Sequence, residues 1–77
     1  MSERLPALKA QEIIRALERA GFTVVRTSGS HKILDHHTDP RRTVIVPDHG
    51  SRDLKRGTVR SIIRQSGLSV EEFRKLL

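Results

Sequence analysis

The spacing of apolar residues changes along the chain, and it divides the sequence into helical and extended segments. Residues 9–20 (KAQEIIRALERA) place their two isoleucines and a leucine along one stripe of a helix, and Gly21 follows as a stop signal. Residues 58–65 (TVRSIIRQ) show the same spacing, and Gly67 closes that segment. The pattern therefore predicts two amphipathic helices, each ended by a glycine.

Between these helices, β-branched residues form three short extended runs. Residues 22–26 (FTVVR) and 43–46 (TVIV) predict strands, and another strand is expected to begin at Ser30 or His31. Alternation along that strand places His31 on one face of the sheet and Lys32 on the other. Because the connections are short, we expect the strands to pair antiparallel.

Polar and turn-forming residues separate these segments. Residues 27–29 are predicted as a turn, and residues 36–40 and 48–56 as loops. Ser69 begins a capping-box pattern that opens a short last helix containing Phe73. The chain is therefore predicted to be an α+β fold, in which two main helices cover one face of a three-stranded antiparallel sheet and a short C-terminal helix follows.

Length and charge narrow the class of protein. With 77 residues, the chain is expected to form one domain, residues 1–77, with a thin core. Lysine and arginine number 15 against 9 acidic residues, which gives a formal net charge of +6, and arginine outnumbers lysine by 11 to 4. Guanidinium groups suit phosphate oxygens, so a nucleic acid is the expected partner, with ordinary surface solubility as the alternative.

Two absences concern the cellular compartment. The chain has no cysteine, which excludes disulfides and thiolate metal sites. Residues 1–10 lack the apolar core of a signal peptide, and no apolar run approaches membrane-spanning length. A cytoplasmic protein without membrane contact is expected.

Histidine supplies the candidate catalytic group. The four histidines are His31, His36, His37 and His49. No metal site is assigned, because the adjacent His36 and His37 are expected to diverge and His31 to face away from His36. The pair is interpreted as solvated loop residues. His31 differs because it follows Gly29 and Ser30, whose backbone amides can approach an anion.

RNA cleavage is a reaction that an imidazole can promote when cations lie near the developing charge and the RNA strand is held in place. Imidazole exchanges protons near neutral pH, so beside a phosphodiester it can deprotonate a ribose 2′-hydroxyl or protonate the leaving 5′-oxygen. RNA supplies its own nucleophile, and neither a metal nor another cofactor is required. The residue chemistry alone leaves two interpretations of His31 open, a proton carrier and a solvated residue at a strand end.

A second cluster of cations precedes the second main helix. Lys55 and Arg56 stand before Gly57, Thr58 is expected to cap the helix, and Arg60 follows. Helix N-termini favour phosphate, so the group is a candidate RNA contact, the alternative being a simple cap with a solvated flank. The chain has no tryptophan or tyrosine and both phenylalanines are expected in the core, so contacts mainly to backbone and sugar are predicted.

These motifs together resemble the HicA (YcfA-like) toxin family, over about residues 5–70. The resemblance rests on short motifs in a fixed order, namely Gly21-Phe22 with Arg26, Gly29-Ser30-His31, Val44-Ile45-Val46-Pro47 with His49, Leu54-Lys55-Arg56-Gly57-Thr58, Ser61-Ile62-Ile63 and Gly67-Leu68-Ser69. It implies a fold similar to a double-stranded RNA-binding domain, with the order α-β-β-β-α.

The resemblance also implies an activity, a site and a partner. It implies an endoribonuclease, or mRNA interferase, that cuts messenger RNA and stops translation, with His31 as the catalytic residue. A HicB-type antitoxin would cover that site in a hetero-oligomer. Lys32 stands where many relatives have a second histidine, and His49 matches a commonly polar position, so it is a candidate helper. The RNA-binding candidates are Gly29, Ser30, Lys32, Lys55, Arg56, Thr58 and Arg60.

Two other classes of function agree with the charge and the predicted fold. A non-enzymatic RNA-binding module would bind RNA with salt-dependent affinity and leave it intact. A partner-docking domain would use its basic face to meet an acidic protein instead of RNA.

Overall fold

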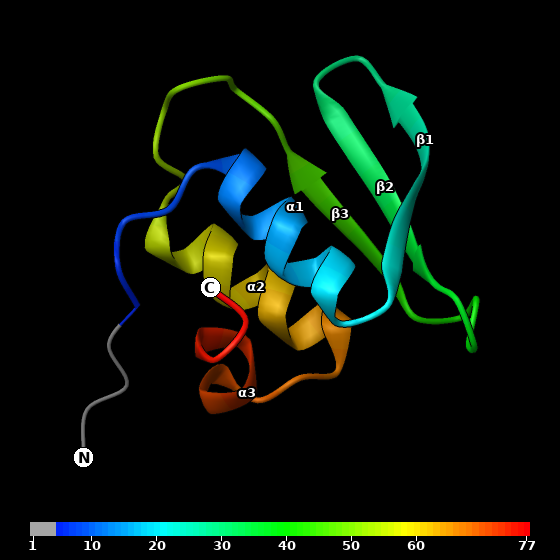
Figure 1. The fold of residues 1–77 in the computed structure, drawn as a ribbon. Coiled ribbons are helices and arrows are strands. Elements are labelled where there is room, and N and C mark those ends of the chain that lie inside the picture. Colours follow the sequence, from blue (N-terminus) through cyan, green and yellow to red (C-terminus); the bar gives the residue numbers. More distant parts are fainter. Residues whose placement is uncertain (1–4) are drawn as a thin grey trace.

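The computed structural model describes residues 5–77 and has the predicted order of elements (Figure 1). The elements are α1 (Ala10–Arg19), β1 (Phe22–Ser28), β2 (His31–His36), β3 (Thr43–Pro47), α2 (Arg56–Ser66) and α3 (Val70–Arg74). The α+β class and the α-β-β-β-α order are confirmed. The expected domain over residues 1–77 includes four N-terminal residues that lie outside the described part.

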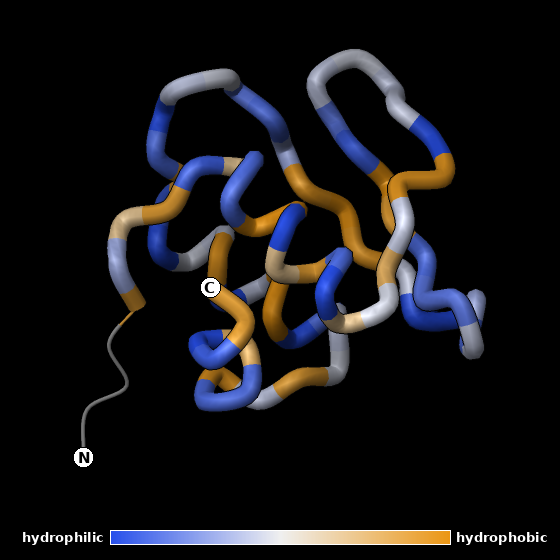
Figure 2. The backbone as a smooth tube through the Cα atoms, viewed as in Figure 1, coloured by the Kyte–Doolittle hydropathy of each residue, from blue (hydrophilic) through white to orange (hydrophobic). Residues whose placement is uncertain are grey.

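The helices and the sheet enclose one apolar core. Alternate strand residues, among them Phe22, Leu34 and Val44, point toward α1 and α2 and are buried. The apolar stripes of both helices meet them, and Phe73 of α3 completes the core, as expected for both phenylalanines. Hydrophobic residues are concentrated on the strands and helices, whereas the connection between β3 and α2 is largely hydrophilic (Figure 2). No helix of residues 5–77 packs on the opposite face of the sheet, and we call it the open face (Figure 1).

The three strands form an antiparallel sheet in the order β1-β2-β3. A bulge at Val25 interrupts the register of β1, since Val24 pairs with Leu34 and Arg26 pairs with Ile33. β1 also extends to Ser28, so the prediction of a turn over residues 27–29 is wrong for its first two residues. The ladder with β2 holds them in the strand, and the turn consists of Gly29 and Ser30.

The second main helix begins two residues earlier than the sequence pattern predicts. Lys55 is the N-cap of α2, Arg56 is its first residue, and Thr58 lies inside the first turn. The prediction that Thr58 caps this helix is therefore wrong. By contrast, the predicted capping box of α3 is confirmed, because the Ser69 hydroxyl accepts a hydrogen bond from the Glu72 amide at 3.0 Å and Glu72 accepts one from the Ser69 amide at 2.8 Å.

The prediction of a solvated, diverging His36–His37 pair is wrong for His36, which is the last residue of β2 and is half-buried. His37 is exposed as predicted, but the two rings do not diverge. The ring centroids lie 4.8 Å apart, and the His36 ring also packs edge-on against Phe22. His36 Nε2 is 3.1 Å from the carbonyl oxygen of Ala20, and His37 Nδ1 is 3.0 Å from that of Gly21. Gly21 lacks a Cβ, which leaves room for both rings against the turn between α1 and β1.

Within residues 5–77, no helix has both the length and the apolar character that crossing a membrane requires.

Candidate functional site

His31 lies on the open face of the sheet, where solvent reaches its side chain. It is the first residue of β2, and its ladder partners are Ser28 on β1 and Pro47 on β3. Its imidazole makes no hydrogen bond or ion pair with any residue of the described chain. The ring is therefore available to a bound molecule, as a proton carrier must be.

A shallow depression surrounds this imidazole, and we call it the His31 hollow. Its lining consists of Arg26, Ser28, His31, Ile33 and Ile45. All three strands contribute to it, because cross-strand partners place their side chains on the same face of a sheet. The hollow combines one proton-exchanging group, one permanent cation and two aliphatic side chains.

The bulge at Val25 explains why Arg26 is in this hollow. Simple alternation from Phe22, which is buried, and Val24, which is partly buried against the core, would place Arg26 on the helical side of the sheet. The extra residue reverses the alternation, so Arg26 pairs with Ile33 and points to the open face. Bulges beside functional sites often redirect a side chain in this way.

Lys32 does not accompany His31. Its ladder partner on β3 is the fully buried Val46, so its side chain leaves the sheet on the helical side. The Gly29-Ser30 turn is exposed next to His31, and the Ser30 carbonyl accepts a hydrogen bond from the Asp48 amide at 2.6 Å. This bond ties the turn to the segment that follows β3.

A second depression, the α2 hollow, lies at the start of α2. It is lined by Pro47, His49, Arg52, Asp53, Leu54, Lys55 and Thr58. Pro47 is the ladder partner of His31, so the two hollows adjoin at the end of β3. His49, Lys55 and Thr58 meet here, whereas Arg56 and Arg60 are exposed on α2 and line neither hollow.

The α2 hollow is positive in character. His49, Arg52 and Lys55 face it, and its one carboxylate, Asp53, is 3.5 Å from the ammonium group of Lys9. Helix α2 also begins there, and no side chain caps its N-terminus. Its first backbone amides and the positive end of its dipole are therefore available to an anion. The arrangement suits the binding of a phosphate group.

The two hollows include residues that were not among the predicted site residues, notably Arg26, Ile33, Ile45 and Arg52. Ile33 shares a face with His31 by strand alternation, and Ile45 is its ladder partner, so the apolar floor follows from local pattern and strand pairing. The position of Arg26 depends on the bulge. Arg52 belongs to a loop whose path no local pattern determines. The described residues contain no group of three side chains able to hold a metal ion.

The fold and this surface describe a small basic α+β protein with an exposed histidine on an open sheet. Comparison with known proteins gives the class: the family model described as HicA toxin of bacterial toxin-antitoxin matches residues 10–68. The chain belongs to the HicA toxin family. It is accordingly the toxin of a toxin–antitoxin pair, and an antitoxin is its partner. No curated protein gives a significant match.

Proposed function

We propose that this toxin is an endoribonuclease that cuts messenger RNA in the cytoplasm and thereby stops translation. The observation that supports this most is the placement of His31. The imidazole is exposed on the open face, has no partner among residues 5–77, and stands beside Arg26 in a hollow that all three strands form. A residue with a purely structural role would make contacts there.

The proposed reaction uses His31 as general base and then as general acid. Its neutral ring takes the proton of a ribose 2′-hydroxyl, and the 2′-oxygen attacks the adjacent phosphorus. The bond from phosphorus to the 5′-oxygen breaks, and the imidazolium or a helper such as His49 returns a proton to that oxygen. The products are a 2′,3′-cyclic phosphate and a 5′-hydroxyl. Arg26 stabilises the negative charge that develops on the phosphoryl oxygens.

The α2 hollow is proposed to hold the neighbouring phosphate of the strand. Lys55 and the amides of the first turn of α2 supply the donors, and Arg52 adds a second cation. Gly29, Ser30, Arg56 and Arg60 would contact the RNA around these two hollows. The Lys32 side chain points to the helical side of the sheet. It would therefore contact only an RNA strand that continues past the edge of the sheet. A HicB-type antitoxin would inhibit by covering His31 in a hetero-oligomer.

The test of catalysis is His31→Ala, assayed on single-stranded RNA in EDTA and by growth arrest on expression. Cleavage is expected to fall about 100- to 10,000-fold. The thermal midpoint should change little, because the exposed ring makes no hydrogen bond or ion pair with residues 5–77. His49→Ala is the matched exposed histidine, and its effect should be smaller. Cleavage by His31→Ala at the wild-type rate would refute the assignment. Salt-dependent RNA binding without cyclic-phosphate fragments would favour the RNA-binding module.

The test of phosphate binding is Lys55→Ala. The affinity for single-stranded RNA is expected to fall, and the slope of log K against log salt to decrease by about 0.7, because one phosphate contact is lost. Lys75→Ala, at the C-cap of α3, removes an equal, exposed charge outside both hollows and should leave that slope unchanged. Equal effects of the two substitutions would show that only net charge matters.

A further inference from the structure

We infer that the apolar part of the open face is a nucleobase subsite, which holds the base of the nucleotide whose 2′-hydroxyl attacks. The subsite consists of Arg26, Ile33 and Ile45. The inference rests on the proposed function, since it takes His31 as the group that meets the reacting ribose. It adds a recognition element where the sequence, lacking exposed aromatic residues, predicts only contacts to backbone and sugar.

The first argument is distance along the sheet. Ile33 is two residues beyond His31 on the same face, which places their Cα atoms about 7 Å apart. Ile45 is the direct ladder partner of Ile33, so the two side chains form one apolar floor. A base is joined directly to its ribose. A nucleotide with its 2′-hydroxyl at the imidazole therefore has its base over this floor or turned out to solvent.

The second argument is the chemistry of the floor. Ile45 is 46% exposed, and Ile33 is partly buried beside it, so an apolar surface faces solvent without a partner in the described chain. Arg26 pairs with Ile33 through the backbone ladder, and its guanidinium group makes no hydrogen bond or ion pair with residues 5–77. An unpaired guanidinium plane is a stacking surface for an unstacked base, and the aliphatic side chains cover the base's apolar face.

The third argument is the distribution of charge, which orients the nucleotide. A further depression continues from Arg26 and Ile33 to Asp35 and Thr43. The Asp35 carboxylate accepts a hydrogen bond from the Thr43 hydroxyl at 2.8 Å and makes this end of the open face negative. Phosphate is repelled there and attracted at the opposite end, where His31 adjoins the α2 hollow. The base, which has no charge, is the part of the nucleotide that fits toward Asp35.

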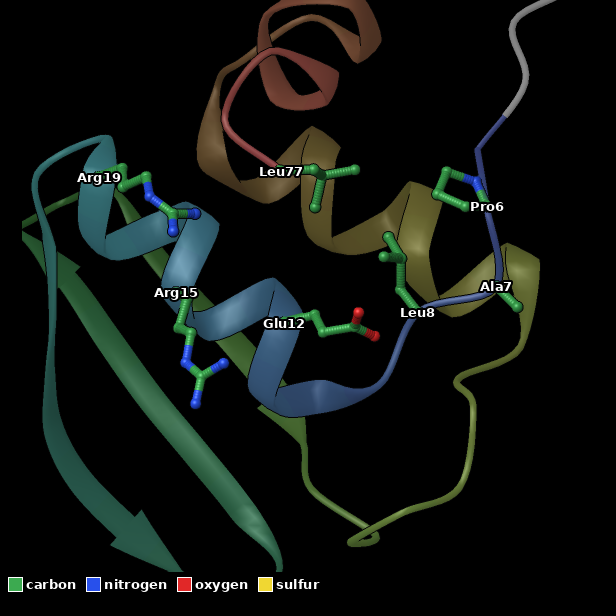
Figure 3. Close-up of a pocket in the computed structure, with 7 residues that line it drawn as sticks. All are labelled: Pro6, Ala7, Leu8, Glu12, Arg15, Arg19 and Leu77. Carbon is green, nitrogen blue, oxygen red and sulfur yellow. The ribbon is translucent and has the colours of Figure 1, made fainter.

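The helical side of the molecule offers matched controls. Figure 3 shows a hollow between α1 and the C-terminus that is lined by Arg15 and Leu77 among others. Leu77 is 45% exposed, nearly the same as Ile45, and Arg15 is an exposed arginine like Arg26. The test pair is therefore Arg26→Ala with Ile45→Thr, and the control pair is Arg15→Ala with Leu77→Thr.

The experiment compares each protein on two RNAs. A cut made by the wild type is mapped in an RNA of mixed sequence, and a second RNA is made with an abasic ribose at the nucleotide 5′ of that cut. Loss of the base is expected to lower wild-type kcat/KM by about 5- to 150-fold, the range of base stacking. The Arg26→Ala/Ile45→Thr protein should cut the intact RNA more slowly than the wild type, because Arg26 also faces the phosphoryl group, but it should cut the intact and the abasic RNA at rates nearly equal to each other. The control pair should show the wild-type ratio of the two rates.

Three results would overturn the inference. The base lies elsewhere if the wild type tolerates base removal, or if base removal slows the wild type and the Arg26→Ala/Ile45→Thr protein equally. If the double substitution leaves the base dependence intact but abolishes antitoxin binding, the face is a protein-docking surface instead. A wild-type protein that leaves the intact RNA uncut would refute the proposed function itself. The intact RNA therefore distinguishes a failure of the proposed function from a failure of the nucleobase subsite.

Discussion

Arg42 is an arginine whose charge the fold uses internally, and its removal gives a quantitative test of the structure. It lies in the connection between β2 and β3, at the end of β2 remote from His31. Its Nε donates to the carbonyl oxygen of Ser66 at 3.1 Å, and Nη2 donates to the same oxygen. Its guanidinium carbon is 5.3 Å from the centre of the Phe22 ring. Arg42 thus joins the sheet to the last turn of α2.

The cost of Arg42→Ala can be estimated from these contacts. Hydrogen bonds from a charged donor contribute about 1.5–3 kcal/mol, and an exposed cation–π contact contributes about 0.5–1 kcal/mol. Water can replace the lost donor at the end of α2, which favours the lower end of the sum. We expect a loss of about 2 kcal/mol in the free energy of unfolding. For a domain of this size, that lowers the melting temperature by about 8–16 °C.

Urea denaturation and thermal melting measure this effect, and the neighbouring arginine is the control. The side chain of Arg41 is 91% exposed, and its Nε is 3.3 Å from Asp39 Oδ1 in a surface ion pair. Arg41→Ala is therefore expected to change stability by less than about 0.5 kcal/mol. Equal destabilisation by the two substitutions, or a loss below about 0.5 kcal/mol for Arg42→Ala, would refute the reasoning.

Two further predictions concern stability. Gly21→Ala should lower the free energy of unfolding by about 1–3 kcal/mol, because Gly21 has φ of +97° and an added Cβ would lie 2.7 Å from His37 Nδ1. Gly57→Ala, in open space on α2, should raise it by about 0.4–1 kcal/mol. Chemical denaturation of both variants checks the contrast. The Ser69 amide, and then its side chain, hold the pKa of Glu72 below 4.5. Its stabilising effect is present above that pH and lost as the pH falls through the folded-state pKa, so Glu72→Gln should lower the melting temperature at pH 7 and not at low pH.

Much of the fold could be predicted because its signals are local. Helical spacing identified α1 and α2, β-branched runs identified the strands, and the Ser69 capping box identified α3. The start of α2 was misplaced because Lys55 caps it with backbone alone, and a side-chain cap was expected at Thr58. His36 and His37 were assigned to a solvated loop because their contacts are with the turn between α1 and β1, more than a dozen residues away.

The candidate site divides in the same way between local and long-range causes. The sequence alone determined that His31 begins a strand after a flexible turn, and that Lys32 faces away from it, since both follow from alternation along one strand. Only the tertiary structure decided that Arg26 stands beside His31, because one unpaired residue in β1 reverses which side chains face the helices. The bulge allows Phe22 and Val24 to pack against the core on one side while Arg26 to Ser28 keep their ladder with β2. Both constraints come from other parts of the fold, so they cannot be read from residues 22–26 alone.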